Sequence, residues 1–121
     1  MTVLVTGAAG RLGRAVVAGF AERRQVVALD RTALDVADRH AVHEAVRAHR
    51  PEVVVNCSAW TDVDGCEGDP QRAQRINAAA VGYLREAAEE VGAHLLHVST
   101  DFVFDGKADV PYREDDLTAP L

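Results

Sequence analysis

Short apolar runs alternate with amphipathic segments along this chain. The mostly apolar runs of five residues lie at residues 2–6, 25–29, 52–56 and 94–98. Their length and their lack of strict polar alternation are typical of strands that are buried in a parallel sheet. Apolar residues that recur every three or four positions predict helices over residues 11–23, 38–49 and 69–91.

The order of these segments predicts the fold class. Strands that alternate with helices form a parallel sheet that is covered by helices on both faces. Right-handed crossovers then predict an α/β protein of the Rossmann type, a doubly wound β-α-β-α-β-α-β sheet with strand order 3-2-1-4 that is truncated after its fourth strand. We expect a single nucleotide-binding domain over residues 1–121.

Residues at the segment boundaries define the helix ends. Asp38 is a typical N-cap residue, Asp69 precedes a proline at a first helical position, and Gly92 is a typical C-terminal stop. The predicted inner face of the first helix consists of Leu12, Ala15, Val16, Gly19 and Phe20. The predicted inner face of the second helix consists of Ala41, Val42, Ala45 and Val46.

Composition and charge exclude several classes of protein. The chain is 48% hydrophobic and 26% charged, with a net charge of −6, so we expect neither a disordered chain nor a nucleic-acid binder. No apolar run approaches the roughly 20 residues of a membrane span. Cys57 and Cys66 lack C-x-x-C spacing, and His40 and His43 lack a third ligand type. We therefore expect a cytoplasmic protein with reduced thiols, no membrane association and no metal site.

The strongest chemical signal is the run from Gly7 to Gly13, which follows the first predicted strand. Gly7 permits a tight turn, Gly10 lets a ligand approach the backbone, and Gly13 lets the helix pack closely. The free amides of the first helical turn, which includes Arg11 and Leu12, can then hold a diphosphate. The run predicts a dinucleotide site, and the alternative is a strand–helix turn without a ligand.

The residues after the second strand bear on how the adenosine part of a cofactor would be bound. Asp30 can accept hydrogen bonds from ribose hydroxyls, which favours NAD, whereas Arg31 can pair with a 2′-phosphate, which favours NADP, or lie in solvent. Asp35, with the amide of Val36, can recognise the adenine edge or can instead help to start the second helix. The cofactor prediction is therefore NADP or NAD.

Polar and small residues follow the third and fourth strands. Such residues leave a crevice at the carboxyl edge of an open sheet, where ligands bind. The residues after the third strand are Cys57, Ser58, Ala59, Trp60 and Thr61. Thr100 can hydrogen-bond a substrate carbonyl and Asp101 can bind sugar hydroxyls. The alternatives are a partly buried aromatic at Trp60 and a simple Ser/Thr-Asp turn after the fourth strand.

Four stretches together resemble the extended short-chain dehydrogenase/reductases, and within them the dTDP-4-dehydrorhamnose reductase family. The stretches are VLVTGAAGRLGRAV, ALDRTALDVAD, RPEVVVNCSAWTDVDGCE and HVSTDFVFDG. The resemblance implies an oxidoreductase that reduces the 4-keto group of a dTDP-deoxysugar with NAD(P)H, in dTDP-L-rhamnose synthesis.

The resemblance also implies roles for particular residues. The implied cofactor-binding residues are Gly7, Gly10, Arg11, Leu12, Gly13, Asp30, Arg31, Asp35, Val36, Cys57, Ser58, Ala59, Thr61 and Asn77. Thr100 is the implied active-site hydroxyl, and the implied substrate contacts are Thr61, Asp101 and Phe102. Phe102 stands where the family usually has tyrosine, and Cys57 stands where it usually has alanine.

One family motif, Tyr-x-x-x-Lys, is absent from the sequence. The single lysine is Lys107, and Val103 stands four residues before it. We therefore expect this chain to supply the cofactor-binding part and to be inactive alone, with the nucleotide-sugar bound by a full-length parent. The alternative is a non-catalytic NADP-binding protein like the regulatory subunit of methionine adenosyltransferase. A fourth strand left as a sheet edge also predicts either a homodimer or marginal stability.

Overall fold

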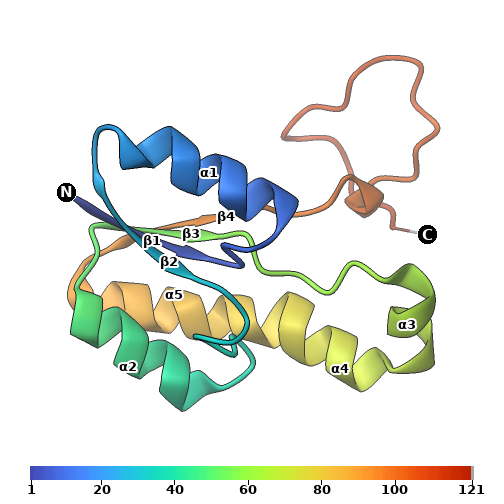
Figure 1. The fold of residues 1–121 in the computed structure, drawn as a ribbon. Coiled ribbons are helices and arrows are strands. Elements are labelled where there is room, and N and C mark those ends of the chain that lie inside the picture. The colour runs from blue at the N-terminus through green and yellow to red at the C-terminus, as the bar shows by residue number, and fades with distance from the viewer. Residues whose placement is uncertain (121) are drawn as a thin grey trace.

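The computed structural model describes residues 1–120, which form an open sheet with helices on both faces (Figure 1). The strands are β1 (Thr2–Thr6), β2 (Gln25–Leu29), β3 (Val53–Asn56) and β4 (His94–His97). All of the strand pairs in this sheet are parallel, which confirms the predicted α/β fold class. Each predicted strand is present within one residue of its expected ends.

The strands lie in the order β2-β1-β3-β4, so the predicted order 3-2-1-4 is wrong. β3 pairs with β1 rather than with β2, and Val3 lies opposite Val53. The reason lies in the side chains of the two competing strands. β3 buries Val54 and Val55 and takes an internal place, whereas β2 exposes Gln25 and Ala28 and forms an edge.

The helices divide between the two faces of the sheet. α1 (Arg11–Ala21) covers one face, while α2 (Arg39–His49) and α5 (Ala80–Val91) cover the other, as Figure 1 shows. The first crossover runs from β1 outward to β2, and the next two run in the opposite direction across the sheet. Since each crossover of a parallel sheet is right-handed, this reversal places the later helices on the opposite face.

α1 packs on the sheet through a face one residue away from the predicted one. Its sheet-facing residues are Gly13, Val16, Val17 and Phe20. Leu12 is 45% exposed, and Ala15 and Gly19 are exposed too, so the predicted stripe is wrong at those positions. Gly13 packs against the backbone of Gly7 and Ala8, and residues 13, 16, 17 and 20 form the helical stripe that includes this contact.

α2 packs as predicted, with Val42 and Val46 fully buried. Its N-cap is Asp38, whose side chain accepts a hydrogen bond of 3.1 Å from the amide of Ala41. The larger core cluster joins these valines to Leu4 of β1 and to residues of β3 and α5. A smaller cluster packs α1 on the other face of the sheet. The two clusters hold the carboxyl ends of the strands at one edge.

The predicted helix over residues 69–91 is interrupted. It consists of α4 (Pro70–Gln74), a π-helical turn η1 (Arg75–Ala79) and α5, and Gly92 ends it with φ 74°. A further short helix, α3 (Val63–Gly68), precedes it and was not predicted. α3 has two glycines and no apolar stripe, and it is started by Asp62, which accepts a hydrogen bond from the amide of Gly65.

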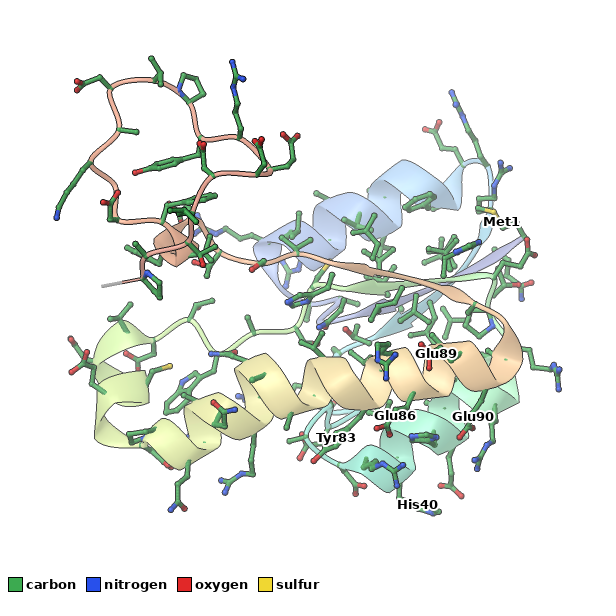
Figure 2. All side chains as sticks on the ribbon, turned by 180° about the vertical axis from the view of Figure 1, so that it is seen from behind. Met1, His40, Tyr83, Glu86, Glu89 and Glu90 are labelled. Atoms are coloured by element: carbon green, nitrogen blue, oxygen red, sulfur yellow. The ribbon has the colours of Figure 1, made fainter. Side chains whose placement is uncertain are left out.

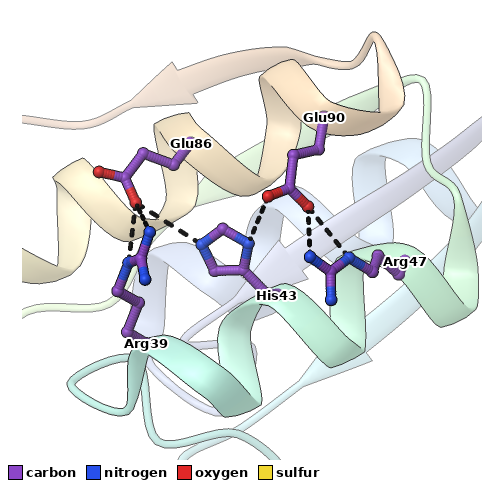
Figure 3. Close-up of polar contacts among 5 residues, drawn as sticks. All are labelled: Arg39, His43, Arg47, Glu86 and Glu90. Atoms are coloured by element: carbon purple, nitrogen blue, oxygen red, sulfur yellow. Dashed lines mark hydrogen bonds and ion pairs between the residues drawn. The ribbon is translucent and has the colours of Figure 1, made fainter.

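A row of charges joins α2 to α5 (Figure 3). Figure 2 shows Glu86 and Glu90 on the side of α5 that lies along α2. Glu86 pairs with Arg39 at 2.9 Å, and Glu90 pairs with Arg47 at 2.9 Å. Between them lies His43, 7% exposed, with Nδ1 3.0 Å from Glu90 and Nε2 3.6 Å from Glu86. Each carboxylate therefore lies between an arginine and the same buried imidazole.

These contacts lower the pKa of both glutamates below the ordinary value of 4.5. For Glu86 the largest cause is the hydrogen bond from Arg39, and for Glu90 it is the hydrogen bond from His43. A carboxylate whose pKa falls on folding stabilises the fold above its unfolded pKa. That stabilisation disappears as the pH falls through the lower pKa of the folded state.

We predict that replacing both carboxylates, Glu86→Gln with Glu90→Gln, flattens the loss of stability below pH 4.5. Urea denaturation at a series of pH values measures the free energy of unfolding. Glu67→Gln is the control, because Glu67 makes no ion pair within residues 1–120. An acid-side slope that is equal in the double variant and in the control would contradict the prediction.

Candidate functional site

The turn between β1 and α1 depends on two glycines. Gly7 has φ 63°, and a Cβ added there would lie 2.7 Å from the carbonyl carbon of Cys57. A Cβ at Gly13 would collide with the carbonyl oxygen of Gly7. At Gly10 the nearest such atom, the same oxygen, is 3.3 Å away, a tight contact but not a collision, and this glycine lines a cleft. The geometry agrees with a tight turn at Gly7 and close helix packing at Gly13.

A cleft of about 230 Å³, here the first cleft, opens beside this turn. It lies at the carboxyl edge of β1 and β3, where the direction of the crossovers reverses and open α/β sheets bind ligands. The predicted site residues that line it are Gly7, Gly10, Arg31, Asp35, Val36, Cys57, Ser58 and Ala59. The other lining residues are Ala9, Leu34, Trp60, Arg72 and Ile76. Arg11, Leu12, Gly13 and Asp30 are not among its lining residues.

Asp30 is engaged in the loop after β2. One carboxylate oxygen accepts hydrogen bonds from the amide and hydroxyl of Thr32, at 2.8 and 2.6 Å, and from the amide of Ala33 at 3.0 Å. The hydroxyl bond from Thr32, followed by the two amide bonds, lowers the pKa of Asp30. Arg31, by contrast, lines the first cleft. Of these two adjacent residues, Arg31 rather than Asp30 therefore lines the cleft.

Asp35 has a local structural role and also lines the cleft. Its carboxylate accepts a hydrogen bond of 2.9 Å from the amide of Ala37, in the turn before α2. The helix itself is capped by Asp38, so Asp35 does not cap α2. Asp35 and Val36 both line the first cleft, as the adenine prediction requires.

A second cleft, of about 470 Å³, lies between the ends of β3 and β4. The predicted residues that line it are Ala59, Thr61, Asn77, Thr100, Asp101 and Phe102. The hydroxyl of Thr100 accepts a hydrogen bond of 3.2 Å from the amide of Phe102, so the predicted Ser/Thr-Asp turn is also present. Ala59 and Trp60 line both clefts, which are therefore neighbours.

Trp60 lies between the two clefts and is held from α4 and η1. Asn77, in the π-helical turn, accepts a hydrogen bond from the amide of Trp60 at 2.8 Å and donates one to its carbonyl at 3.0 Å. The guanidinium of Arg72 lies 4.3 Å from the centre of the indole ring. Asn77, whose predicted role is cofactor binding, here positions Trp60. Arg72 was not predicted, since its spacing along the helix gives no sign of this contact.

A row of polar side chains crosses the sheet beneath the clefts. The hydroxyl of Thr6 donates to Oδ1 of the buried Asn56 at 2.7 Å, and the amide of Ser58 donates to the same oxygen at 3.0 Å. Nδ2 of Asn56 lies 3.1 Å from Nδ1 of His97, which therefore accepts. Sequence reasoning missed this row, although the three apolar runs each have a polar residue at this register.

Other candidate chemistry is limited. Partial burial raises the pKa of the Cys57 thiol, which makes it less reactive, and the Cys66 thiol lies 3.4 Å from the carbonyl of Trp60. Within residues 1–120, no three histidine, cysteine or acidic side chains are grouped to hold a metal ion. Among the helices of the same residues, none is long and apolar enough to cross a membrane.

The RmlD substrate binding domain family matches residues 1–121. The chain belongs to this family. A dTDP-4-dehydrorhamnose reductase from Streptomyces griseus is 50% identical over 119 residues, which are 97% of this chain and 39% of that protein. The corresponding enzyme from Escherichia coli is 40% identical over 125 residues, covering all of this chain and 42% of that protein. The chain thus spans about two-fifths of the length of these relatives.

This RmlD family member is also similar in structure to solved dTDP-4-dehydrorhamnose reductases. A dTDP-4-dehydrorhamnose reductase from Clostridium acetobutylicum superposes with a TM-score of 0.94 at 40% identity, over 99% of this chain and 43% of that one. The enzyme from Bacillus anthracis, solved in complex with NADP, has a TM-score of 0.93 at 33% identity, over 98% of this chain and 43% of that one.

We predict that Gly13→Ala destabilises the fold by about 1–3 kcal/mol, because the added methyl group meets backbone that cannot move aside. Gly19→Ala is the matched control on the same helix, since no atom lies within 4 Å of a Cβ at that position. It should stabilise the helix by about 0.5–1 kcal/mol. Urea denaturation of both variants tests the pair, and equal effects would refute the packing role of Gly13.

Proposed function

We propose that this chain is the dinucleotide-binding part of an NAD(P)H-dependent reductase that acts on the 4-keto group of a dTDP-deoxysugar. The observation that carries the proposal is the first cleft, where the glycine turn, Arg31, Asp35 and Val36 converge at the point where the crossovers reverse. The NADP complex of the Bacillus anthracis relative supports a dinucleotide as the ligand.

The diphosphate is assigned to the first turn of α1. The first helical hydrogen bond runs from Arg14 to the carbonyl of Gly10 at 3.0 Å, so the preceding amides of Arg11, Leu12 and Gly13 remain for a ligand. Helix N-termini bind anions through such amides and through the helix dipole. In this proposal the backbone amides of Arg11, Leu12 and Gly13 bind the diphosphate next to Gly10, which lines the first cleft.

The adenosine half is assigned to the first cleft and the nicotinamide half to the second. NAD(P)H supplies the hydride when bound. Ala59 and Thr61 flank the nicotinamide end, and the Thr100 hydroxyl donates to the substrate carbonyl oxygen, where negative charge develops. Asp101 and Phe102 lie beside it in the same cleft for sugar contacts.

In this proposal, none of these residues donates the proton that the reduction of a ketone requires. No tyrosine in the 121-residue sequence is followed four positions later by a lysine. General acid catalysis contributes about 10²–10⁴-fold to rates. We therefore expect the isolated chain to bind the cofactor and to turn over dTDP-4-keto sugars at a negligible rate.

The central test is a thermal shift titration of the 121-residue chain with NADPH and NADH. A ligand at about 100 times its dissociation constant stabilises by about 2.7 kcal/mol, which raises the melting temperature by several degrees. Gly10→Val should abolish this shift because its side chain occupies the diphosphate position. Gly19→Val, on the exposed side of α1, is the control. The proposal fails if neither nucleotide changes the melting temperature of the unaltered chain.

We further predict that the chain prefers NADPH to NADH, since Arg31 lines the cleft while Asp30 is engaged with Thr32 and Ala33. Arg31→Ala should weaken NADPH binding by about 10–100-fold, the value of a hydrogen bond to a charged group, and leave NADH binding unchanged. Calorimetry with each nucleotide measures this. Arg24→Ala, distant from the cleft, is the control, and an equal loss for both nucleotides would contradict a 2′-phosphate contact.

A further inference from the structure

Two sets of arginines in this chain differ in their surroundings. Arg39, Arg47 and Arg85 each pair with a glutamate on α5. Arg31 and Arg72 line the first cleft, and neither pairs with a carboxylate of residues 1–120. The cleft therefore presents two cations, Arg31 and Arg72, against one carboxylate, Asp35, in a chain whose net charge is −6.

Arg72 is held in place by its neighbours. It lies in the first turn of α4, where its amide donates to the N-cap carboxylate of Asp69 at 2.9 Å. Its guanidinium lies 4.3 Å from the centre of the Trp60 ring. Trp60 is in turn fixed by the two hydrogen bonds of Asn77. The guanidinium is thus positioned through α4 and η1 without an acidic partner.

The position of Arg72 in the first cleft indicates which part of a dinucleotide it contacts. Arg72 and Ile76 line the first cleft together with Asp35 and Val36, whereas the second cleft, which contains Thr100, does not include them. A planar guanidinium stacks on aromatic rings and on nucleobases, and an ammonium group does not offer such a plane. The pairing with Trp60 holds this plane at the wall of the cleft.

We propose that Arg72, stacked on Trp60, is a specificity-determining contact for the adenosine half of the dinucleotide. This inference rests on the proposed function of the first cleft and adds to that site a residue from α4. The apolar side chain of Ile76 lies one helical turn further along the same wall. An adenine ring then meets a cationic plane and an aliphatic surface on this wall, facing Asp35 and Val36.

The experiment compares 5′-AMP, nicotinamide mononucleotide and NADPH by calorimetry on the 121-residue chain. Arg72→Ala should weaken AMP and NADPH binding by about three- to thirtyfold, the range of a cation–π contact, and leave the mononucleotide unaffected. Arg75→Ala is the matched control, because Arg75 is the next arginine on the same helical segment and does not line either cleft.

Two more variants test the stacking. Arg72→Lys keeps the charge but loses the plane, and should bind AMP as weakly as Arg72→Ala. Trp60→Leu releases the guanidinium, and its effect should not add to that of Arg72→Ala in the double variant. Melting temperatures without nucleotide report on folding, and those of Arg72→Ala and Arg75→Ala should match.

The outcomes separate this inference from the function on which it rests. If the unaltered chain binds NADPH and Arg72→Ala binds AMP equally well, the role of Arg72 is refuted while the proposed function stands. A lysine variant that binds AMP like the unaltered chain overturns the stacking contact. A chain that binds neither AMP nor NADPH overturns both proposals.

Discussion

The contact between the backbone of Gly7 and the backbone of Cys57 sets the geometry of the carboxyl edge of the sheet. A single added carbon at Gly7 would lie 2.7 Å from Cys57, and one at Gly13 would meet Gly7 itself. Three chain segments, from β1, α1 and β3, are therefore packed backbone to backbone at one point. Because side chains are excluded there, the surrounding side chains form walls around the turn and leave Gly10 facing an open cleft.

Charged side chains are paired at the interface of α2 and α5 and unpaired at the clefts. Where α2 meets α5, away from the clefts, each of Glu86 and Glu90 is shared between an arginine and His43. At the clefts, Arg31 and Arg72 lack such partners among the described residues. Exposed ion pairs contribute little to stability, whereas unpaired cations in a concave surface attract anions. Although the chain as a whole is acidic, the charge at the clefts is therefore suited to a phosphorylated ligand.

The sequence predicted those features that depend on neighbours along the chain. Strand limits, the caps at Asp38 and Asp69 and the glycine turn are local, and the structure confirms them. Strand order was wrong because it depends on which of two strands, β2 or β3, competes better for an internal place. The inward face of α1 was displaced by one residue because the close approach at Gly13 decides it.

At the candidate site, too, the local features were predicted and those that depend on contacts between distant segments were not. The residues after each strand were predicted to gather at one edge, because parallel strands end there, and most of them line the two clefts. The link between Asn56 and His97 was not predicted, since it depends on the register of two strands. Arg72 was not predicted because its spacing along the helix gives no sign of its contact with Trp60, which lies in another segment. The π-helical turn η1 joins two halves of one helical segment, α4 and α5, that have different surroundings. Up to and within this turn, Arg72 and Ile76 line the first cleft, whereas Ala80 and Leu84 beyond it are fully buried in the core. The C-terminal half of this segment therefore anchors it in the protein interior, while its N-terminal half forms part of a cleft wall.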